Sequence, residues 1–205
     1  MMRTLAIDCA TEACSVALID EGGLIAADHR VLGRGHAEHL VPMIAALPER
    51  GRADRIVVSL GAGSFTGVRI GIATAKALGY AWSAPVFGYP TLALVAAIAS
   101  EDEGWSSLTV CMSGGHGEWF VQDFVRHGRP DGDLASCTPQ AAVARGGDRP
   151  LAGSQAAALA EVLEHRVPAR DQLPDASRIG LLDPALFSPV VTPIYGRGPD
   201  ARLPA

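Results

Sequence analysis

The amino-acid sequence predicts an α/β protein. Three short apolar segments stand close together at the start of the chain, and a Gly-Gly pair separates the second from the third, which predicts an antiparallel meander of strands. Between residues 55 and 100, apolar segments of strand length alternate with longer segments of helix formers, which predicts a parallel crossover. With 205 residues, of which 48% are hydrophobic, the chain can bury a substantial core.

The meander is followed by a change of apolar period. The three strands are expected at Thr4–Asp8, Ser15–Ile19 and Leu24–Ala27, with the tight turn at Gly22–Gly23. After Gly35 the apolar residues recur at helical spacing, at Leu40, Met43, Ile44 and Leu47, and Pro48 ends the segment. Pro42 predicts that this helix is kinked or begins at that point.

The alternating region supplies the next four elements. The continuous apolar run Ile56–Leu60 is typical of a strand covered on both faces. A helix over Val68–Trp82, a strand over Pro85–Phe87 and a helix over Thr91–Ser100, with Thr91 as a candidate N-cap, are expected to follow. The acidic cluster Glu101–Gly104 then marks the expected boundary between an N-terminal subdomain, residues 1–103, and a smaller C-terminal subdomain, residues 104–205.

The second half has weaker patterns. The segments Leu108–Met112 and Glu118–Val125 flank Ser113–Gly117 and predict a hairpin. The stretch His127–Asp148 is rich in Gly, Asp and Pro and predicts a loop. An alanine-rich helix is expected over Ser154–His165.

Composition argues against several classes of protein. The net charge is about −5 without a basic run, which disfavours a stand-alone nucleic-acid binder. The four cysteines show no metal-ligand spacing and predict reduced thiols. The start of the chain lacks the apolar core of a signal peptide, and no uncharged apolar stretch is long enough to span a bilayer, so a cytoplasmic protein is expected.

The glycine-rich stretch GAGSFTGVRIG, residues 61–71, resembles a phosphate loop at first sight. A Walker loop needs GxxxxGK, but Val68 follows Gly67. A dinucleotide fold needs GxGxxG and a carboxylate about 20 residues on, and residues 55–100 contain no Asp or Glu. Free amides at a helix start can still hold an anion, for which the candidates are Gly63, Ser64, Thr66 and Gly67. The alternative, a turn in which Ser64 or Thr66 caps the helix, is favoured.

The helix after this stretch carries two stripes. Ile70, Ala73, Ala77 and Tyr80 share one side, and the small residues Gly71, Ala75 and Gly79 share another. Small residues at four-residue spacing permit close helix packing, and a helix that is apolar around most of its circumference is buried on more than one side. The pattern predicts either a helix of the fold core or a subunit interface.

At this point the sequence resembles that of a known family. GAGSFTGVRIGIATAKALG is similar to the signature GPGSFTGxRIGxxxAKxLA of the bacterial TsaB (YeaZ) family. Further similar segments follow the family's order: Ile7–Thr11 with Cys14–Ala17, His36–Ile44, Phe87–Leu92 and Pro193–Arg197. The resemblance is strong over residues 4 to about 100 and loose beyond. In the second half Met112–Phe120 lacks the two arginines of the family's DARRGEVY, and Ala62 replaces the signature's proline.

The resemblance implies an actin-like (ASKHA, ribonuclease H-like) α/β fold of two related subdomains. It implies a role in placing threonylcarbamoyl on the adenosine beside the anticodon of tRNAs that read codons beginning with A. The family member is a non-catalytic subunit that pairs with its paralogue TsaD, meets the ATPase TsaE through the complex, contacts tRNA indirectly and forms homodimers when alone. The implied pairing surface lies on two helices and includes His36, Leu40, Met43, Ile44, Ile70, Ala73, Lys76, Ala77 and Tyr80.

The residues also support a non-catalytic role. TsaD holds its metal with histidines on the helix that follows the strand after the glycine loop, whereas Gly88–Ala97 contains no His, Asp or Glu, so no metal is expected. Ala10 stands where actin-like ATP users have glycine, so no cofactor is expected on the isolated chain, and ATP only at the complex interface. The alternative is an actin-like ATPase or sugar-kinase-like enzyme using Asp8 and the Gly61–Gly67 loop. A peptidase is disfavoured, because the sequence shows no nucleophile–base pair.

Overall fold

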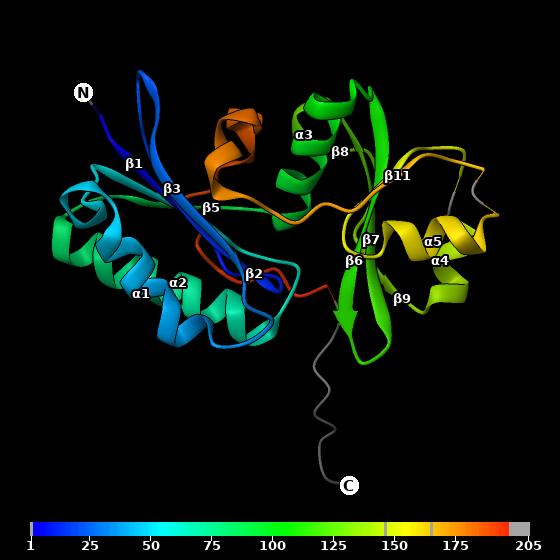
Figure 1. Ribbon diagram of the computed structural model, residues 1–205, viewed down its shortest axis with the longest axis horizontal. Helices are drawn as coiled ribbons and strands as arrows, with labels where there is room; N and C mark the ends of the chain where they lie inside the picture. Colours follow the sequence, from blue (N-terminus) through cyan, green and yellow to red (C-terminus); the bar gives the residue numbers. More distant parts are fainter. Residues whose placement is uncertain (1, 146, 165, 197–205) are drawn as a thin grey trace, which may run out of the picture.

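The computed structural model describes residues 2–145, 147–164 and 166–196, and in it the chain forms two halves, each built on one sheet (Figure 1). The first sheet has the strand order β3-β2-β1-β4-β5. Its strands are β1 (Thr4–Asp8), β2 (Ala13–Asp20), β3 (Gly23–Val31), β4 (Arg55–Ser59) and β5 (Val86–Tyr89). The first three pair in antiparallel fashion, and β4 and β5 continue in parallel from β1.

The second sheet repeats this order. Its strands are β6 (Ser107–Gly115), β7 (Glu118–Val125), β8 (Arg129–Pro130), β9 (Ala135–Cys137), β10 (Leu151–Ala152) and β11 (Ala169–Arg170). β6, β7 and β8 form an antiparallel meander, and β10 and β11 add in parallel beside β6. Each half therefore has the order 3-2-1-4-5 in its own numbering, which confirms the predicted α/β fold of two related halves.

Helices separate and cover the two sheets. They are α1 (His36–Ala46), α2 (Phe65–Trp82), α3 (Thr91–Glu103), α4 (Pro139–Arg145) and α5 (Ala156–Val162), with short 3₁₀ turns at η1 (Pro48–Gly51), η2 (Arg126–Gly128), η3 (Ala176–Leu181) and η4 (Pro184–Leu186). Among the described residues, no helix is both long and apolar enough to cross a membrane.

Three apolar layers result from this arrangement. The outer face of the first sheet, with Ile7 and Val58, packs under α1 and α2. Its inner face packs with α3, η3 and the near face of the second sheet, where Phe124 is fully buried. The far face of the second sheet packs under α4 and α5. Helix α3 is buried on nearly every side because it lies between the two sheets.

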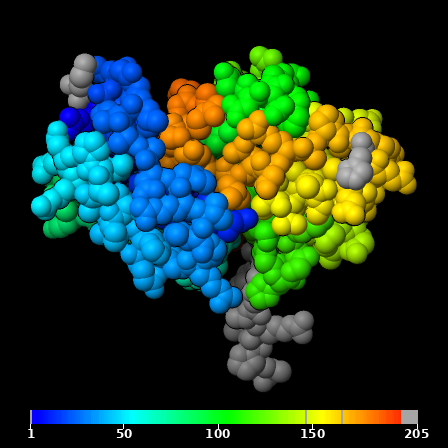
Figure 2. All heavy atoms as spheres, in the orientation of Figure 1, coloured from blue at the N-terminus to red at the C-terminus, as the bar shows by residue number. Residues whose placement is uncertain are grey.

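The end of the described chain returns to the first half. Residues 176–186, drawn in orange, lie between the two halves on the face that Figure 2 shows. Ser188 exchanges two backbone hydrogen bonds with Gly88, of 2.8 and 2.9 Å, and Ile194 N donates to the Leu60 carbonyl at 2.7 Å. The predicted boundary after residue 103 lies between α3 and β6, and the placement of separate subdomains stays a prediction.

Several predicted elements needed correction. Helix α1 begins at His36 and continues through Pro42. Pro90, not Thr91, is the N-cap of α3; the Thr91 hydroxyl instead hydrogen-bonds with that of Ser59. The predicted loop over residues 127–148 contains β8, β9 and α4, because these short elements form by packing against β7. The helix predicted over residues 154–165 spans Ala156–Val162, and His165 lies outside the described residues.

Candidate functional site

The first sheet has a topological switch point at the carboxyl ends of β1 and β4. The chain leaves β1 toward β2 on one side of the sheet and later adds β4 on the other side. Ligands of open α/β sheets bind in the crevice outside such strand ends. In this chain the crevice lies between Cys9–Ala10, which follow β1, and the glycine loop, residues 61–67, which follows β4.

The protein's own backbone closes this crevice. A Cβ atom added to Gly63 would overlap the Ala10 carbonyl, and one added to Gly67 would overlap the Cys9 carbonyl. The amide of Ser64 donates to the Ala10 carbonyl oxygen at 2.6 Å. The two glycines are therefore needed for close contact between the loop and the end of β1, and this contact occupies the space in which a phosphate would approach β1.

The predicted helix cap is Ser64. Its side-chain oxygen accepts a hydrogen bond from Gly67 N at 3.2 Å and so satisfies a donor of the first turn of α2. Thr66 is exposed in the same turn. Two amides of the loop thus already have partners within the protein. Anion binding by the loop stays a prediction, and this geometry does not favour it. The predicted anion ligands are Gly63, Ser64, Thr66 and Gly67.

Asp8 lies at the end of β1 and is fully engaged within the core. Its Oδ1 atom accepts from Ala10 N at 2.9 Å, and its Oδ2 atom lies 3.1 Å from the Tyr89 hydroxyl. Burial raises the pKa of Asp8 to about 6, although the hydrogen bonds from Ala10, Tyr89 and Ser59 oppose the shift. Both carboxylate oxygens serve the fold, which does not favour the ATPase alternative.

Tyr89 completes this buried cluster and was missed by the sequence analysis. It is fully buried at the end of β5, and its ring meets the ring of Phe187 edge to face at a centroid distance of 6.3 Å. The nearest signal in the sequence was an aromatic residue at the end of a strand, directly before a helix. Among the described residues, no three His, Cys, Asp or Glu side chains gather as metal ligands would.

The predicted pairing residues of α1 lie on its inner face. His36, Leu40, Met43 and Ile44 are all buried in the chain's own core, and His36 Nε2 is 3.2 Å from the Ala13 carbonyl oxygen. They face the sheet because the apolar stripe of an amphipathic helix packs on the core. Partner binding by these four residues stays a prediction, which their burial in the chain's own core does not favour. The outward residues include Val41, whose exposed fraction is 55%, and Ala45.

The predicted pairing residues of α2 lie mostly outward. Ala73, Lys76, Ala77 and Tyr80 are exposed, Tyr80 to 92%, whereas Ile70 is half-buried. The small-residue stripe faces the other way. Atoms of Val58, Cys9 and Ile7 lie within 4 Å of a Cβ built on Gly71, and Gly79 packs against Val86. The small-residue stripe therefore packs α2 against the sheet. Of the two roles that the sequence left open, fold core or subunit interface, the stripe serves the fold core.

An aromatic cluster stands at the exposed start of α2. The Arg69 guanidinium lies over the Phe65 ring, 3.5 Å from its centroid, and donates to the Tyr195 hydroxyl at 2.9 Å. The Phe65 and Tyr195 rings are 5.6 Å apart, and both side chains are more than half exposed. Sequence analysis noted Phe65 and Tyr195 as parts of two separate motifs. Arg197 of the second motif lies outside the described residues.

We name the exposed side of the two helices the outer helix face. It comprises Val41 and Ala45 of α1 with Phe65, Arg69, Ala73, Lys76, Ala77 and Tyr80 of α2. The helices lie side by side on the side of the first sheet opposite α3 (Figure 1). Their charged residues are Glu38, Arg69 and Lys76. Exposed large apolar side chains such as Val41, Phe65 and Tyr80 are of the kind that a partner protein can cover.

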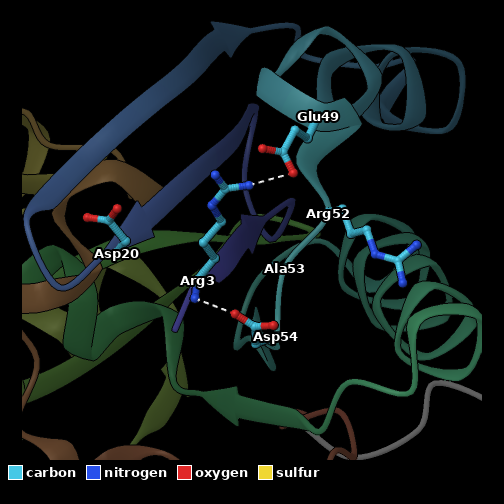
Figure 3. Close-up of a pocket in the computed structure, with 6 residues that line it drawn as sticks. All are labelled: Arg3, Asp20, Glu49, Arg52, Ala53 and Asp54. Carbon is cyan, nitrogen blue, oxygen red and sulfur yellow. Dashed lines mark hydrogen bonds and ion pairs between the residues drawn. The ribbon is translucent and has the colours of Figure 1, made fainter. Parts of the chain in front are cut away.

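A polar hollow of about 360 Å³ lies at the opposite end of the first sheet (Figure 3). Arg3, Asp20, Glu49, Arg52, Ala53 and Asp54 line it. The Arg3 side chain pairs with Glu49 at 2.7 Å, and its backbone amide donates to Asp54 at 2.8 Å. This hollow lies at the amino ends of β1 and β4, away from the switch point, where ligands of α/β sheets bind. The positive charge of Arg3 is balanced there by its ion pair with Glu49.

Comparison with known proteins gives the family. The profile of the TsaD family, described as tRNA N6-adenosine threonylcarbamoyltransferase, matches residues 28–181. A Pseudomonas aeruginosa protein described as similar to the peptidase YeaZ superposes with a TM-score of 0.78 and 30% identity, over 96% of this chain and 100% of that one. The chain belongs to the TsaB (YeaZ) family. YeaZ from Pseudomonas aeruginosa superposes with a TM-score of 0.76 and 29% identity, over 95% and 100% of the two chains.

A TsaB relative of known role is also similar. The Escherichia coli tRNA threonylcarbamoyladenosine biosynthesis protein TsaB is 35% identical over 130 residues, which are 61% of this chain and 56% of that protein. The match thus spans just over half the length of the curated relative. The predicted family is confirmed.

Proposed function

We propose that this TsaB-family chain is a non-catalytic subunit in the biosynthesis of threonylcarbamoyladenosine on tRNA and that its outer helix face binds a TsaD-type paralogue. The printed role of the Escherichia coli relative supports the process. The product would be the modified adenosine next to the anticodon of tRNAs that read codons beginning with A.

The outer helix face is the observation that carries this proposal. Its exposed apolar side chains include Val41, Phe65 and Tyr80, and burying them on a partner is favourable by about 25 cal/mol per Å² of apolar area. The cluster of Phe65, Arg69 and Tyr195 has the composition of an interface hot spot, in which aromatic and arginine side chains predominate. The few charges on α1 and α2 keep the desolvation cost of pairing low.

The closed crevice at the switch point supports the proposal that this chain is not the catalytic subunit. The contact of Gly63 and Gly67 with the end of β1 fills the crevice in which an α/β protein places its ligand, and Asp8 is held by the fold. We therefore propose that the isolated chain needs no metal or cofactor and that ATP binds only where the chain meets its partners in the complex.

The remaining partners follow from pairing through a single face. We propose that a second copy of the chain covers the outer helix face when the TsaD-type partner is absent, giving a homodimer. A TsaE-type ATPase would join through the complex, and tRNA would be contacted indirectly. A cytoplasmic location suits this role.

A charged substitution tests the proposed face. Ala73 is exposed on α2, so Ala73→Glu is expected to leave the monomer's stability within about 0.5 kcal/mol. Burial of an unpaired carboxylate on pairing would cost about 3 kcal/mol, which is roughly a hundredfold in dissociation constant. Isothermal titration with the TsaD-type protein of the same organism measures this loss.

The matched control is Ala141→Glu, which places the same charge on the exposed side of α4 in the second half. It should bind like the unmodified chain. Equal affinities for all three chains would show that the outer helix face is not where the partner binds. If both variants lost affinity alike, a nonspecific effect of negative charge would explain the result instead.

A further inference from the structure

Two cysteines meet at the end of the first hairpin. The sulfur atoms of Cys9 and Cys14 are 3.4 Å apart, and both side chains are buried. Cys9 directly follows β1, and Cys14 is the second residue of β2. Both thiols are buried and so lie outside the outer helix face.

The pair lies in register across the two strands. The β1–β2 ladder runs from Thr4 opposite Ile19 to Asp8 opposite Ser15, so Cys9 and Cys14 form the next opposing pair. Opposing residues of an antiparallel pair have Cα atoms about 4.5 or 5.5 Å apart, depending on the hydrogen-bonding position. Disulfides join Cα atoms about 4.4 to 6.8 Å apart, so either position permits a bridge.

We propose that Cys9 and Cys14 form a reversible disulfide when the protein meets a hydroperoxide, which makes the end of the hairpin a redox modification site. One thiolate attacks the peroxide oxygen and becomes a sulfenic acid as hydroxide leaves. The second thiol then attacks the sulfenic sulfur, the S–S bond forms and water leaves. The two thiols are oxidised by two electrons in total, and the hydroperoxide is reduced. A dithiol restores the pair by exchange.

The contact between the sulfurs prepares this reaction. The hydrogen bond from Cys9 lowers the pKa of Cys14, although burial opposes the shift. Because both thiols are buried, the oxidant reaches them when the short turn between the strands opens, and Glu12 in that turn is half exposed. The reaction should therefore be slower than that of a free surface thiol.

The other two cysteines provide an internal comparison. Cys111 on β6 pairs with Val121 of β7, and Cys137 on β9 pairs with Trp119 of the same strand. Strand β7 thus lies between them, and two strand spacings put their backbones about 9 to 10 Å apart. This is too far for a bridge without backbone movement.

The cysteine pair lies next to the contact between α2 and the end of β1. The Cys9 carbonyl is the group that Gly67 approaches, and a Cβ on Gly71 would lie 3.6 Å from the Cβ of Cys9. A bridge that holds Cys9 to β2 would therefore also restrain the start of α2. The inference does not depend on the proposed function, because it concerns thiol chemistry within one chain.

Peptide mapping tests the proposal on the unmodified protein. The chain is treated with hydrogen peroxide, unfolded, alkylated and digested with trypsin. Residues 4–30 stay together in a single peptide because no Lys or Arg lies between Arg3 and Arg30. The expected peptide carries neither alkyl group and is about 2 Da lighter than the dithiol form, and dithiothreitol before alkylation restores both groups. Cys111 should remain alkylated.

Two results would overturn the proposal. One is a peptide that still carries both alkyl groups, and the other is a peptide whose sulfurs have gained oxygen instead of being linked. The variant Cys14→Ser adds a second check, because Cys9 should then stay open to alkylation after treatment. Cys111→Ser is the matched control and should leave the linkage of residues 9 and 14 unchanged. Equal loss of Cys9 in the Cys14→Ser chain would contradict a paired reaction.

Discussion

At the scale of single residues, Asp8 at the end of β1 has a structural role, because both of its carboxylate oxygens are hydrogen-bonded within the core. Tyr89 and Ala10 N occupy its two oxygens, and burial makes its charged form costly. The sequence showed Asp8 at the end of a strand but not its neighbours, because Tyr89 reaches it from a strand 81 residues away along the chain. Burial and long-range contact of this kind leave no local pattern.

The raised pKa of Asp8 has a consequence for stability. Its folded pKa of about 6 lies above the reference value of 3.8, so the folded state holds the proton more tightly. The contribution of Asp8 to stability is therefore fully present below about pH 4 and is lost as the pH rises through about 6. In Asp8→Asn this loss is absent, and the amide can donate to the Tyr89 hydroxyl, which can donate to the Ile7 carbonyl oxygen.

We expect the free energy of unfolding of Asp8→Asn, relative to the unmodified chain, to rise by on the order of 2 kcal/mol between pH 4 and pH 7. Urea denaturation at the two pH values measures this difference. A variant that loses stability relative to the unmodified chain over the same interval would mean that the ionised carboxylate stabilises the fold.

At the scale of elements, the long helix α2 is placed by its small residues. Gly67 and Gly71 approach the end of β1, and Gly79 approaches the start of β5. The same spacing could have served a helix–helix contact, so the sequence left both interpretations open. The sheet decides between them, because the opposite side of α2 carries Lys76 and Tyr80, which are exposed.

Gly67→Ala tests this seat. The added Cβ would overlap the backbone carbonyl of Cys9, which cannot rotate away, and a cost of about 2 kcal/mol in unfolding free energy is expected. Gly180→Ala is the control, because the added Cβ has no atom within 4 Å, and its effect should stay within about 0.5 kcal/mol. Thermal and urea unfolding of both variants provide the comparison. Equal stability of the two would remove the argument for a closed crevice.

Long strands were predictable from the sequence, whereas very short strands were not. Strands β1 and β4 were predicted within a residue, since continuous apolar runs specify buried strands directly. Strands β8, β9, β10 and β11 have two or three residues each and were missed, because they exist only through pairing with longer neighbours. The burial of the predicted pairing residues of α1 was not foreseen, because the family resemblance named them as a surface whereas their apolar stripe packs on the sheet.

At the scale of the whole molecule, two halves of the same strand order share one central layer, and the chain's return to the first half ties them together. Residues 188–194 pair with Gly88 and Leu60, and Val191 is buried in the core beneath α1 and α2. The family resemblance predicted the duplicated fold. It could not predict this returning segment, whose irregular backbone follows no period.

Truncation tests the role of the returning segment. A chain that ends at Phe187 loses the hydrogen bonds to Gly88 and Leu60 and the burial of Val191, for a total on the order of 3 kcal/mol. A chain that ends at Gly196 keeps these contacts and is the control. Differential scanning calorimetry should show a lower melting temperature for the shorter chain. Identical melting of the two truncated chains would contradict the assigned role.

The central claim is that this chain works by pairing through its outer helix face, and one measurement addresses it directly. Size-exclusion chromatography with light scattering is run on the protein alone and mixed with the TsaD-type protein of the same organism. We predict a homodimer for the chain alone and, in the mixture, a heterodimer that forms at the homodimer's expense. Two unchanged peaks in the mixture at micromolar concentrations would contradict the account.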